Sequence, residues 1–132
     1  MNSHRINFRV RYGETDQMGV VYHGSYPPYF EMGRTEWLRN LGVTYKWMEQ
    51  NNVMLPVVDL QIRYKLPIFY DDQVTVITEL RENPTYKIIF DYQLLNAKNE
   101  LCATANTTLV FKSIVTNKLT RAPEYLLEKL KP

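Results

Sequence analysis

Three side chains that can take up or release a proton lie close together near the N-terminus. Glu14, Asp16 and His23 fall within residues 12–26, which read YGETDQMGVVYHGSY. The same stretch holds glycines at positions 13, 19 and 24, and glycine lets a backbone turn tightly or approach a ligand closely. Side chains that do chemistry are often carried on loops fixed by rigid elements at both ends. This stretch is therefore the first candidate for a functional site.

The residues of this stretch leave more than one interpretation open. An aspartate in a glycine-bearing turn often accepts hydrogen bonds from its own backbone, so Asp16 has a structural as well as a catalytic interpretation. His23 is either a satisfied or exposed imidazole or a proton carrier. Glu14 is most simply a solvated charge. A metal site made from all three matches no established ligand spacing, so we predict no metal here.

Composition narrows the class of protein. Hydrophobic residues make up 45% of the 132 residues and charged residues 23%, which is ordinary for one soluble globular domain spanning residues 1–132. The formal net charge of +2 is too small to indicate nucleic acid or an anionic membrane as a partner. A single cysteine excludes an intrachain disulfide and fits a reducing compartment. No segment has the apolar length of a signal peptide or a membrane span, so we expect a cytoplasmic enzyme or binding protein.

Helical and alternating periodicity predicts the elements that hold this stretch. Apolar and polar residues alternate over residues 5–12, which predicts a half-buried strand. A helix is predicted from about Pro28 to Leu41, because apolar residues recur there at helical spacing, and Gly42 is placed to cap it. Gly33 within that stripe costs about 1 kcal/mol of helix propensity relative to alanine. We therefore interpret Gly33 as a point of close approach to a sheet.

After this helix a second, short helix is predicted over residues 44–51, and the period then changes to alternation. Four strands are predicted, over residues 58–65, 74–82, 86–94 and 101–112. Their short connections predict an antiparallel meander, and Pro123 is placed to open a closing helix. The apolar surface of a single helix must be buried away from solvent, and one curved sheet can bury it. The order therefore predicts an α+β fold in which an antiparallel sheet wraps around a long central helix.

The opening stretch also resembles the signature of a known family, the hotdog-fold acyl-CoA thioesterases. The branch it resembles includes 4-hydroxybenzoyl-CoA thioesterase and the Tol-Pal-associated YbgC-type enzymes. The matching run is Tyr12-x-Glu14-Thr15-Asp16-x-x-Gly19-Val20-Val21-Tyr22-His23-x-x-Tyr26. Further matches are Phe30-Glu31-x-x-Arg34-Thr35-Glu36, Arg63-Tyr64-x-x-Pro67 and Asp71-Asp72. The resemblance covers essentially the whole chain and implies the hotdog fold, in agreement with the periodicity.

The resemblance implies chemical roles for two residues. Asp16 stands at the position of the catalytic carboxylate, which acts as a general base on water or as a nucleophile. His23 stands at the histidine of YbgC-type members, where the side chain orients the carboxylate or water and the backbone N–H holds the thioester oxygen. The implied reaction hydrolyses an acyl-CoA to a free acid and coenzyme A without metal or cofactor. Family members generally lack the pair Pro27-Pro28, which predicts a later or kinked helix start.

The resemblance also supplies candidates for substrate binding. Gly19 belongs to the matched loop. Four aromatic residues could line an acyl pocket, although an aromatic residue at helical spacing commonly packs in the core: Tyr22, Tyr26, Tyr29 and Trp37. Arg63 could meet the phosphates of coenzyme A, although a basic residue on a strand commonly faces solvent.

The sequence leaves more than one interpretation of the assembly and of the activity open. The implied assembly is a homodimer joined sheet edge to sheet edge, or a homotetramer, with each active site at the dimer interface. An open sheet edge also predicts association. One alternative is a non-catalytic module that binds acyl-CoA or acyl carrier protein without turnover. The other is a hotdog dehydratase acting on acyl carrier protein, a branch with histidine in the loop and an acid on the helix, whereas here Asp16 precedes His23.

Overall fold

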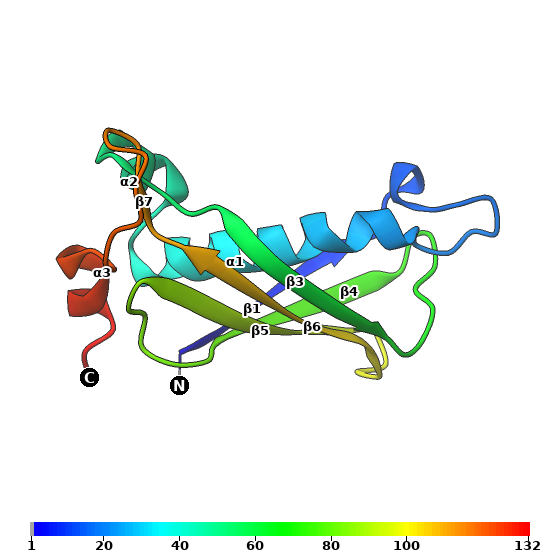
Figure 1. The fold of residues 1–132 in the computed structure, drawn as a ribbon. Helices are drawn as coiled ribbons and strands as arrows, with labels where there is room; N and C mark the ends of the chain where they lie inside the picture. The colour runs from blue at the N-terminus through cyan, green and yellow to red at the C-terminus, as the bar shows by residue number, and fades with distance from the viewer. Residues whose placement is uncertain (1) are drawn as a thin grey trace.

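A computed structural model describes residues 2–132 and shows one antiparallel sheet with a long helix lying along one face (Figure 1). Helix α1 spans Tyr26–Leu41. The five strands of the sheet lie in the order β1-β4-β5-β6-β3. Their bounds are β1 Ser3–Arg9, β3 Val57–Tyr64, β4 Gln73–Leu80, β5 Lys87–Leu95 and β6 Leu101–Val110. The predicted α+β arrangement of a sheet around a central helix is confirmed.

Helix α1 packs directly onto strands β1 and β4 of the sheet. A Cβ atom at Gly33 would lie 2.5 Å from Oγ1 of Thr78 and 2.8 Å from Cγ1 of Val76, both on β4. Only glycine allows this approach, so the predicted role of Gly33 is confirmed. Aromatic rings fill the space around it, with Phe30 against Tyr92 at a centroid distance of 4.9 Å. The close packing of helix and sheet therefore depends on the absence of a side chain at Gly33.

The residues at each end of α1 explain where the helix begins and where it ends. The helix begins at Tyr26, and Pro27 and Pro28 both fit in its first turn, where a backbone N–H has no intrahelical partner to lose. The prediction of a later or kinked start is therefore wrong. At the other end Gly42 adopts a left-handed φ of 101° and closes the helix, as predicted.

Strand β3 lies at an edge of the sheet, which differs from the predicted meander. It pairs with β6, the last long strand, rather than with β4, the strand that follows it in the chain. The connection of residues 65–72 can reach about 26 Å when extended. Three strand spacings from β3 to β4 need only about 14 Å. A short connection therefore did not require the two strands to be neighbours, and the four-strand meander is wrong.

The smaller elements gather at the two ends of the molecule (Figure 1). Helix α2 (Tyr45–Gln50) rises at one end together with a second two-stranded sheet of β2 (Val53–Met54) and β7 (Lys112–Ser113), which was not predicted. The closing helix α3 spans Glu124–Lys129. The segment between β1 and α1 projects at the opposite end and contains the 3₁₀ turns η1 (Tyr12–Glu14) and η2 (His23–Ser25).

Strand β1 ends at Arg9, earlier than predicted, because the chain turns into η1, and Tyr12 is 78% exposed. No helix within residues 2–132 has the length and hydrophobicity to cross a membrane.

Candidate active site

The segment between β1 and α1 folds into a tight hairpin. Thr15 and Val21 form an antiparallel bridge, and the N–H of Asp16 donates to the carbonyl of Val20 at 2.9 Å. Gly19 lies in the turn with a left-handed φ of 79°, and its N–H donates to the carbonyl of Asp16 at 3.0 Å. Because a residue with a Cβ adopts this φ only with strain, glycine is required at the turn. The hairpin therefore holds Asp16 in a defined position.

The hairpin is anchored to the connection between β3 and β4. The N–H of Val21 donates to the carbonyl of Ile68 at 2.7 Å, and the N–H of Tyr70 donates to the carbonyl of Gly19 at 3.0 Å. Ile68 is fully buried, so the anchor reaches into the core. The rigid sheet thus positions the loop through segment 68–70.

The carboxylate of Asp16 divides its two oxygens between structure and solvent. Oδ1 accepts the N–H of Met18 at 2.9 Å and that of Val20 at 3.4 Å. Oδ2 has no hydrogen-bond partner within residues 2–132 and is not enclosed. The turn-forming interpretation of Asp16 is therefore correct, and one oxygen remains free for chemistry. The structural and catalytic interpretations do not exclude each other.

Glu14 is a structural anchor of the hairpin, and its interpretation as a solvated charge is wrong. Its Oε1 accepts the N–H of Arg11 at 2.8 Å and the hydroxyl of Tyr29 at 2.9 Å. Its Oε2 accepts the Arg11 guanidinium at 2.9 Å, and the side chain of Glu14 is only 15% exposed. Burial would raise the pKa of Glu14, but these hydrogen bonds outweigh burial and hold the pKa below its ordinary value.

Tyr29 is the α1 side of this anchor, a role that the sequence did not predict for it. Burial and the hydrogen bond to Glu14 both raise the pKa of Tyr29, so its hydroxyl stays protonated and remains a donor. Arg11 and Glu14 are three residues apart, which is a recognisable spacing for a local pair. Tyr29 lies 15 residues beyond Glu14, and no local pattern connects them.

Free backbone donors lie where the hairpin enters α1. Ser25 donates its N–H to the carbonyl of Tyr22 at 2.8 Å and its hydroxyl to the carbonyl of Glu14 at 3.0 Å. The N–H groups of His23 and Gly24 have no acceptor within residues 2–132. They precede the N-terminus of α1, where the helix dipole favours negative charge. This arrangement can bind a developing oxyanion.

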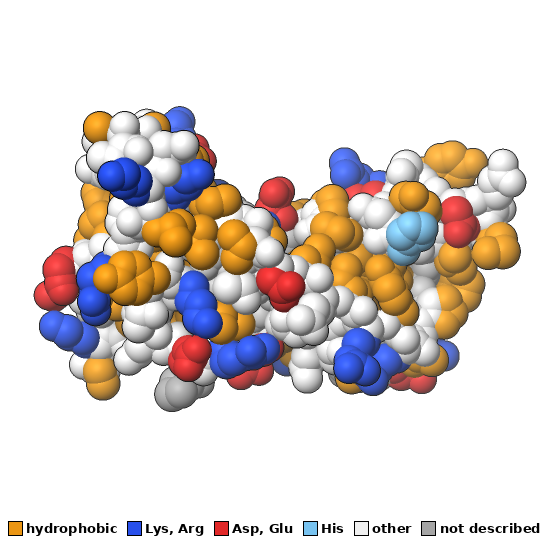
Figure 2. Space-filling model, in the orientation of Figure 1, with side chains coloured by type: hydrophobic (Ala, Val, Ile, Leu, Met, Phe, Trp, Pro, Cys, Tyr) orange, Lys and Arg blue, Asp and Glu red, His pale blue; other side chains and the backbone are white. Residues whose placement is uncertain are grey.

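The two predicted catalytic residues lie on one hairpin without a hydrogen bond or ion pair between them. The exposed ring of His23 packs on the ring of Tyr22, which is 49% exposed, at a centroid distance of 4.3 Å. No hydrogen bond or ion pair joins Asp16 to His23 within the described part of the chain. Figure 2 shows an imidazole on the surface at this end of the molecule.

The other predicted substrate residues lie elsewhere. Tyr26 is 4% exposed and packs edge-on against Tyr64 at 4.8 Å, and burial raises its pKa to about 12. Arg63 borders a cavity of about 280 Å³ together with Glu79 and Asp91, away from the hairpin. The structure therefore brings together Asp16, Gly19, Tyr22 and His23 on one loop, but it buries Tyr26 and separates Arg63 from them.

Among residues 2–132 no group of three or more histidine, cysteine, aspartate or glutamate side chains is placed to hold a metal ion.

Comparison with known proteins relates this chain to a family. Residues 10–130 match the model of the Thioesterase-like superfamily. YneP of Bacillus subtilis, named provisionally as an acyl-CoA thioesterase, is 38% identical over 82% of this chain and 78% of its own. The Escherichia coli acyl-CoA thioester hydrolase YbgC is 29% identical over 93% of this chain and 92% of its own.

Solved structures agree with the sequence relatives. The crystal structure of DHNA-CoA thioesterase from Staphylococcus aureus superposes with a TM-score of 0.89 and 35% identity, covering 96% of this chain and 85% of that one. A hypothetical protein from Thermus thermophilus has a TM-score of 0.90 and 32% identity, covering 96% and 95% of the two chains. The chain therefore belongs to the Thioesterase-like superfamily and has a hotdog fold.

Proposed function

We propose that this protein is an acyl-CoA thioesterase that hydrolyses an acyl-CoA to a free acid and coenzyme A, with Asp16 as its catalytic carboxylate. The observation that carries the proposal is the free Oδ2 of Asp16, held on the same hairpin as the unpaired N–H groups of His23 and Gly24. The names of the relatives, acyl-CoA thioesterase and acyl-CoA thioester hydrolase, support coenzyme A thioesters as the substrate class.

The geometry is suited to thioester hydrolysis. Asp16 either takes a proton from water that attacks the thioester carbon or attacks that carbon itself, and both routes use the free oxygen. The N–H groups of His23 and Gly24 donate to the oxyanion, and the exposed imidazole of His23 binds water. Coenzyme A leaves as a thiolate, and with a thiol pKa of about 8.5 it needs little help from an acid. Tyr22 and Gly19 border the reacting group.

We also propose that the active protein is a cytoplasmic homodimer or homotetramer. Strand β3 lies at an open sheet edge and exposes Val57, Val58, Leu60 and Tyr64, which are 38–59% exposed. Figure 2 shows hydrophobic side chains gathered on the surface around this strand. An unpaired apolar edge is a template for strand pairing, and a second copy of β3 in antiparallel orientation would cover it.

The test is a panel of acyl-CoAs of differing length and aromaticity, with release of free thiol as the readout. We expect turnover of at least one member, unchanged by EDTA. Saturable binding without thiol release would support a binding module instead. Hydration or dehydration of a carrier-bound acyl group without thiol release would support a dehydratase.

A further inference from the structure

The hydroxyl of Ser25 bonds differently from what its place at the start of α1 predicts. Ser25 is the N-cap residue of this helix, and serine is favoured there because its side-chain oxygen accepts an N–H of the first helical turn. The side chain of Ser25 makes no such bond. Its hydroxyl instead donates to the backbone carbonyl of Glu14, 11 residues earlier in the chain, at 3.0 Å. A serine at a helix start therefore serves the hairpin.

Pro27 and Pro28 explain why the helix does not use this hydroxyl. An N-cap side chain accepts the N–H of the second or third helical residue. Because α1 begins at Tyr26, these two positions are Pro27 and Pro28, and proline has no N–H. The proline pair therefore removes both donors that Ser25 would cap.

The same proline pair limits where the start of α1 can hold negative charge. The first four N–H groups of an α-helix have no partner within it. In α1 two of these four positions are the prolines, and the N–H groups of Ser25 and Tyr26 donate back to the carbonyls of residues 22 and 23. Among residues 2–132, the free backbone donors before this helix are those of His23 and Gly24. The position of η2 therefore decides where an oxyanion can be held.

The carbonyl of Glu14 connects η2 to the part of the hairpin that carries Asp16. It accepts the N–H of Tyr22 at 2.9 Å and the hydroxyl of Ser25 at 3.0 Å, so it is bonded on both sides of residues 23–24. Asp16 lies two residues after Glu14 in the sequence. The bond from Tyr22 comes from the backbone and does not depend on a side chain. The bond from Ser25 is the one that a substitution can remove.

We propose that Ser25 is a positioning residue, whose hydroxyl fixes the turn of His23 and Gly24 relative to Asp16; this rests on the proposed thioesterase function. An oxyanion is stabilised only by donors that already lie within hydrogen-bond reach when it forms, and a small displacement of the turn weakens both bonds. Without the Ser25 hydroxyl the turn is attached to Glu14 on one side only. The substrate then binds as before, while its transition state is held less well.

The first experiment measures kcat, KM and Tm of Ser25→Ala on one good acyl-CoA. We expect kcat to fall by about tenfold to hundredfold with KM nearly unchanged, because the lost bond matters most once the oxyanion has formed. Ser25→Thr retains the hydroxyl and should retain most of kcat. A Ser25→Ala protein with wild-type kcat and a lowered Tm, or with a change in KM alone, would overturn the positioning role.

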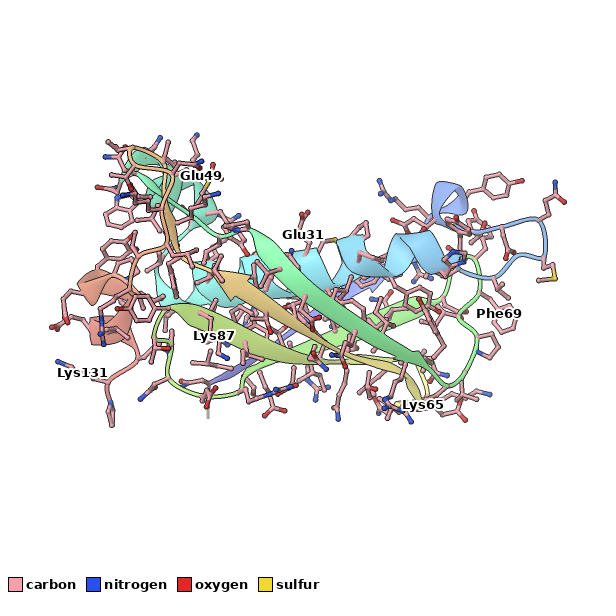
Figure 3. The ribbon with its side chains drawn as sticks, in the orientation of Figure 1. Glu31, Glu49, Lys65, Phe69, Lys87 and Lys131 are labelled. Atoms are coloured by element: carbon pink, nitrogen blue, oxygen red, sulfur yellow. The ribbon has the colours of Figure 1, made fainter. Side chains whose placement is uncertain are left out.

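Thr44→Ala is the matched control, because Thr44 is a half-buried N-cap residue whose side chain does cap its helix. Its Oγ1 accepts the N–H of Trp47 at 3.0 Å at the start of α2. Figure 3 shows Glu49 of α2 and Phe69, which pairs with Val20 of the hairpin, at opposite ends of the molecule. We expect Thr44→Ala to lower Tm and to leave kcat unchanged. A loss of kcat as large as that of Ser25→Ala would attribute both losses to general destabilisation and overturn the inference.

A second variant keeps the test decisive if Ser25→Ala does not fold. Ser25→Cys nearly keeps the size of the side chain, but a thiol is a weak donor, so its kcat should lie clearly below that of Ser25→Thr. Equal kcat of the wild type and Ser25→Cys would overturn the role of the hydroxyl.

These outcomes separate the two proposals. A wild type that hydrolyses acyl-CoAs beside a fully active Ser25→Ala protein overturns the positioning role and leaves the thioesterase function standing. A wild type that releases no thiol from any acyl-CoA overturns the thioesterase function itself.

Discussion

At the scale of single residues, Asp16 combines two tasks in one carboxylate. Its Oδ1 closes the turn through Met18 and Val20, while Oδ2 faces no protein donor within residues 2–132. The hydrogen bonds that define the turn therefore also aim the free oxygen. His23 differs, because the group that its proposed oxyanion role needs is its backbone N–H, which any residue except proline would supply.

Substitution of Asp16 and of His23 should show which of the two contributes more to kcat. Asp16→Asn keeps the turn-forming oxygen but removes the base and nucleophile, so kcat should fall by a factor of about 10²–10⁴ or more. His23→Ala keeps the backbone N–H, so its loss should be clearly smaller. The measurement is kcat of both variants on one good acyl-CoA, with Asp91→Asn on the outer sheet face as a control of unchanged rate. Near-wild-type turnover of Asp16→Asn would sink the mechanism, and a larger loss for His23→Ala would reverse the roles.

At the scale of elements, Glu14 joins the hairpin to the central helix. Arg11 precedes η1, Glu14 ends it, and Tyr29 reaches down from the first turn of α1. The hairpin is thus held on one side by α1 and on the other by segment 68–70. This double attachment is what a catalytic loop needs, because a small displacement of a reacting group costs much of its rate.

The stabilisation by Glu14 should depend on pH. The folded-state pKa of Glu14 is lowered from 4.5, so its ionised form stabilises the native state above that pH, and the stabilisation is lost as the pH falls through the lowered pKa. Glu14→Gln should therefore reduce the free energy of unfolding by about 1–3 kcal/mol at pH 7, with a smaller difference from wild type at pH 3. Denaturant unfolding at both pH values measures this.

The control for this prediction is Glu36, on the solvent-exposed face of α1. Glu36 forms only an exposed pair with Arg39, so Glu36→Gln should change the unfolding free energy by about 0.5 kcal/mol or less. A difference for Glu14→Gln that is the same at both pH values would show that the charge of Glu14 contributes nothing.

At the scale of the whole molecule, the sheet has one edge that suits self-association. Strand β1 at the other edge carries polar side chains in every second position, whereas β3 exposes Val57, Val58 and Leu60. The projecting ends of the molecule flank β3 (Figure 1), so a second copy could seat itself between them.

Sedimentation should therefore show a dimer or tetramer of the 15.7 kDa chain at micromolar concentration. Val58→Lys places a charge on the β3 edge and should shift the protein to the monomer, with loss of thioesterase activity. Val115→Lys is the matched control, because Val115 is 74% exposed in the turn after β7, and it should leave assembly unchanged. A wild type that sediments only as a monomer would rule out the interface.

Much of the fold could be predicted from local patterns. Alternation identified the five long strands, helical spacing identified α1, and Gly33 and Gly42 had the roles that a helix stripe and a helix end require. The glycine turn and the family signature pointed to Asp16 and His23. Such features are visible in sequence because backbone hydrogen bonding repeats over a few residues, and each pattern is complete within one short segment.

The tertiary structure alone decided what depends on residues far apart in the chain. The place of β3 at a sheet edge follows from its pairing with β6, about 45 residues later, and strand alternation is the same for either partner. Glu14 is an anchor because Tyr29 folds back to it, and Arg34 borders a cavity because α2 and segment 54–56 close around it. Burial and long-range contact, rather than residue type, determine which charged side chains are solvated and which can bind or position a substrate.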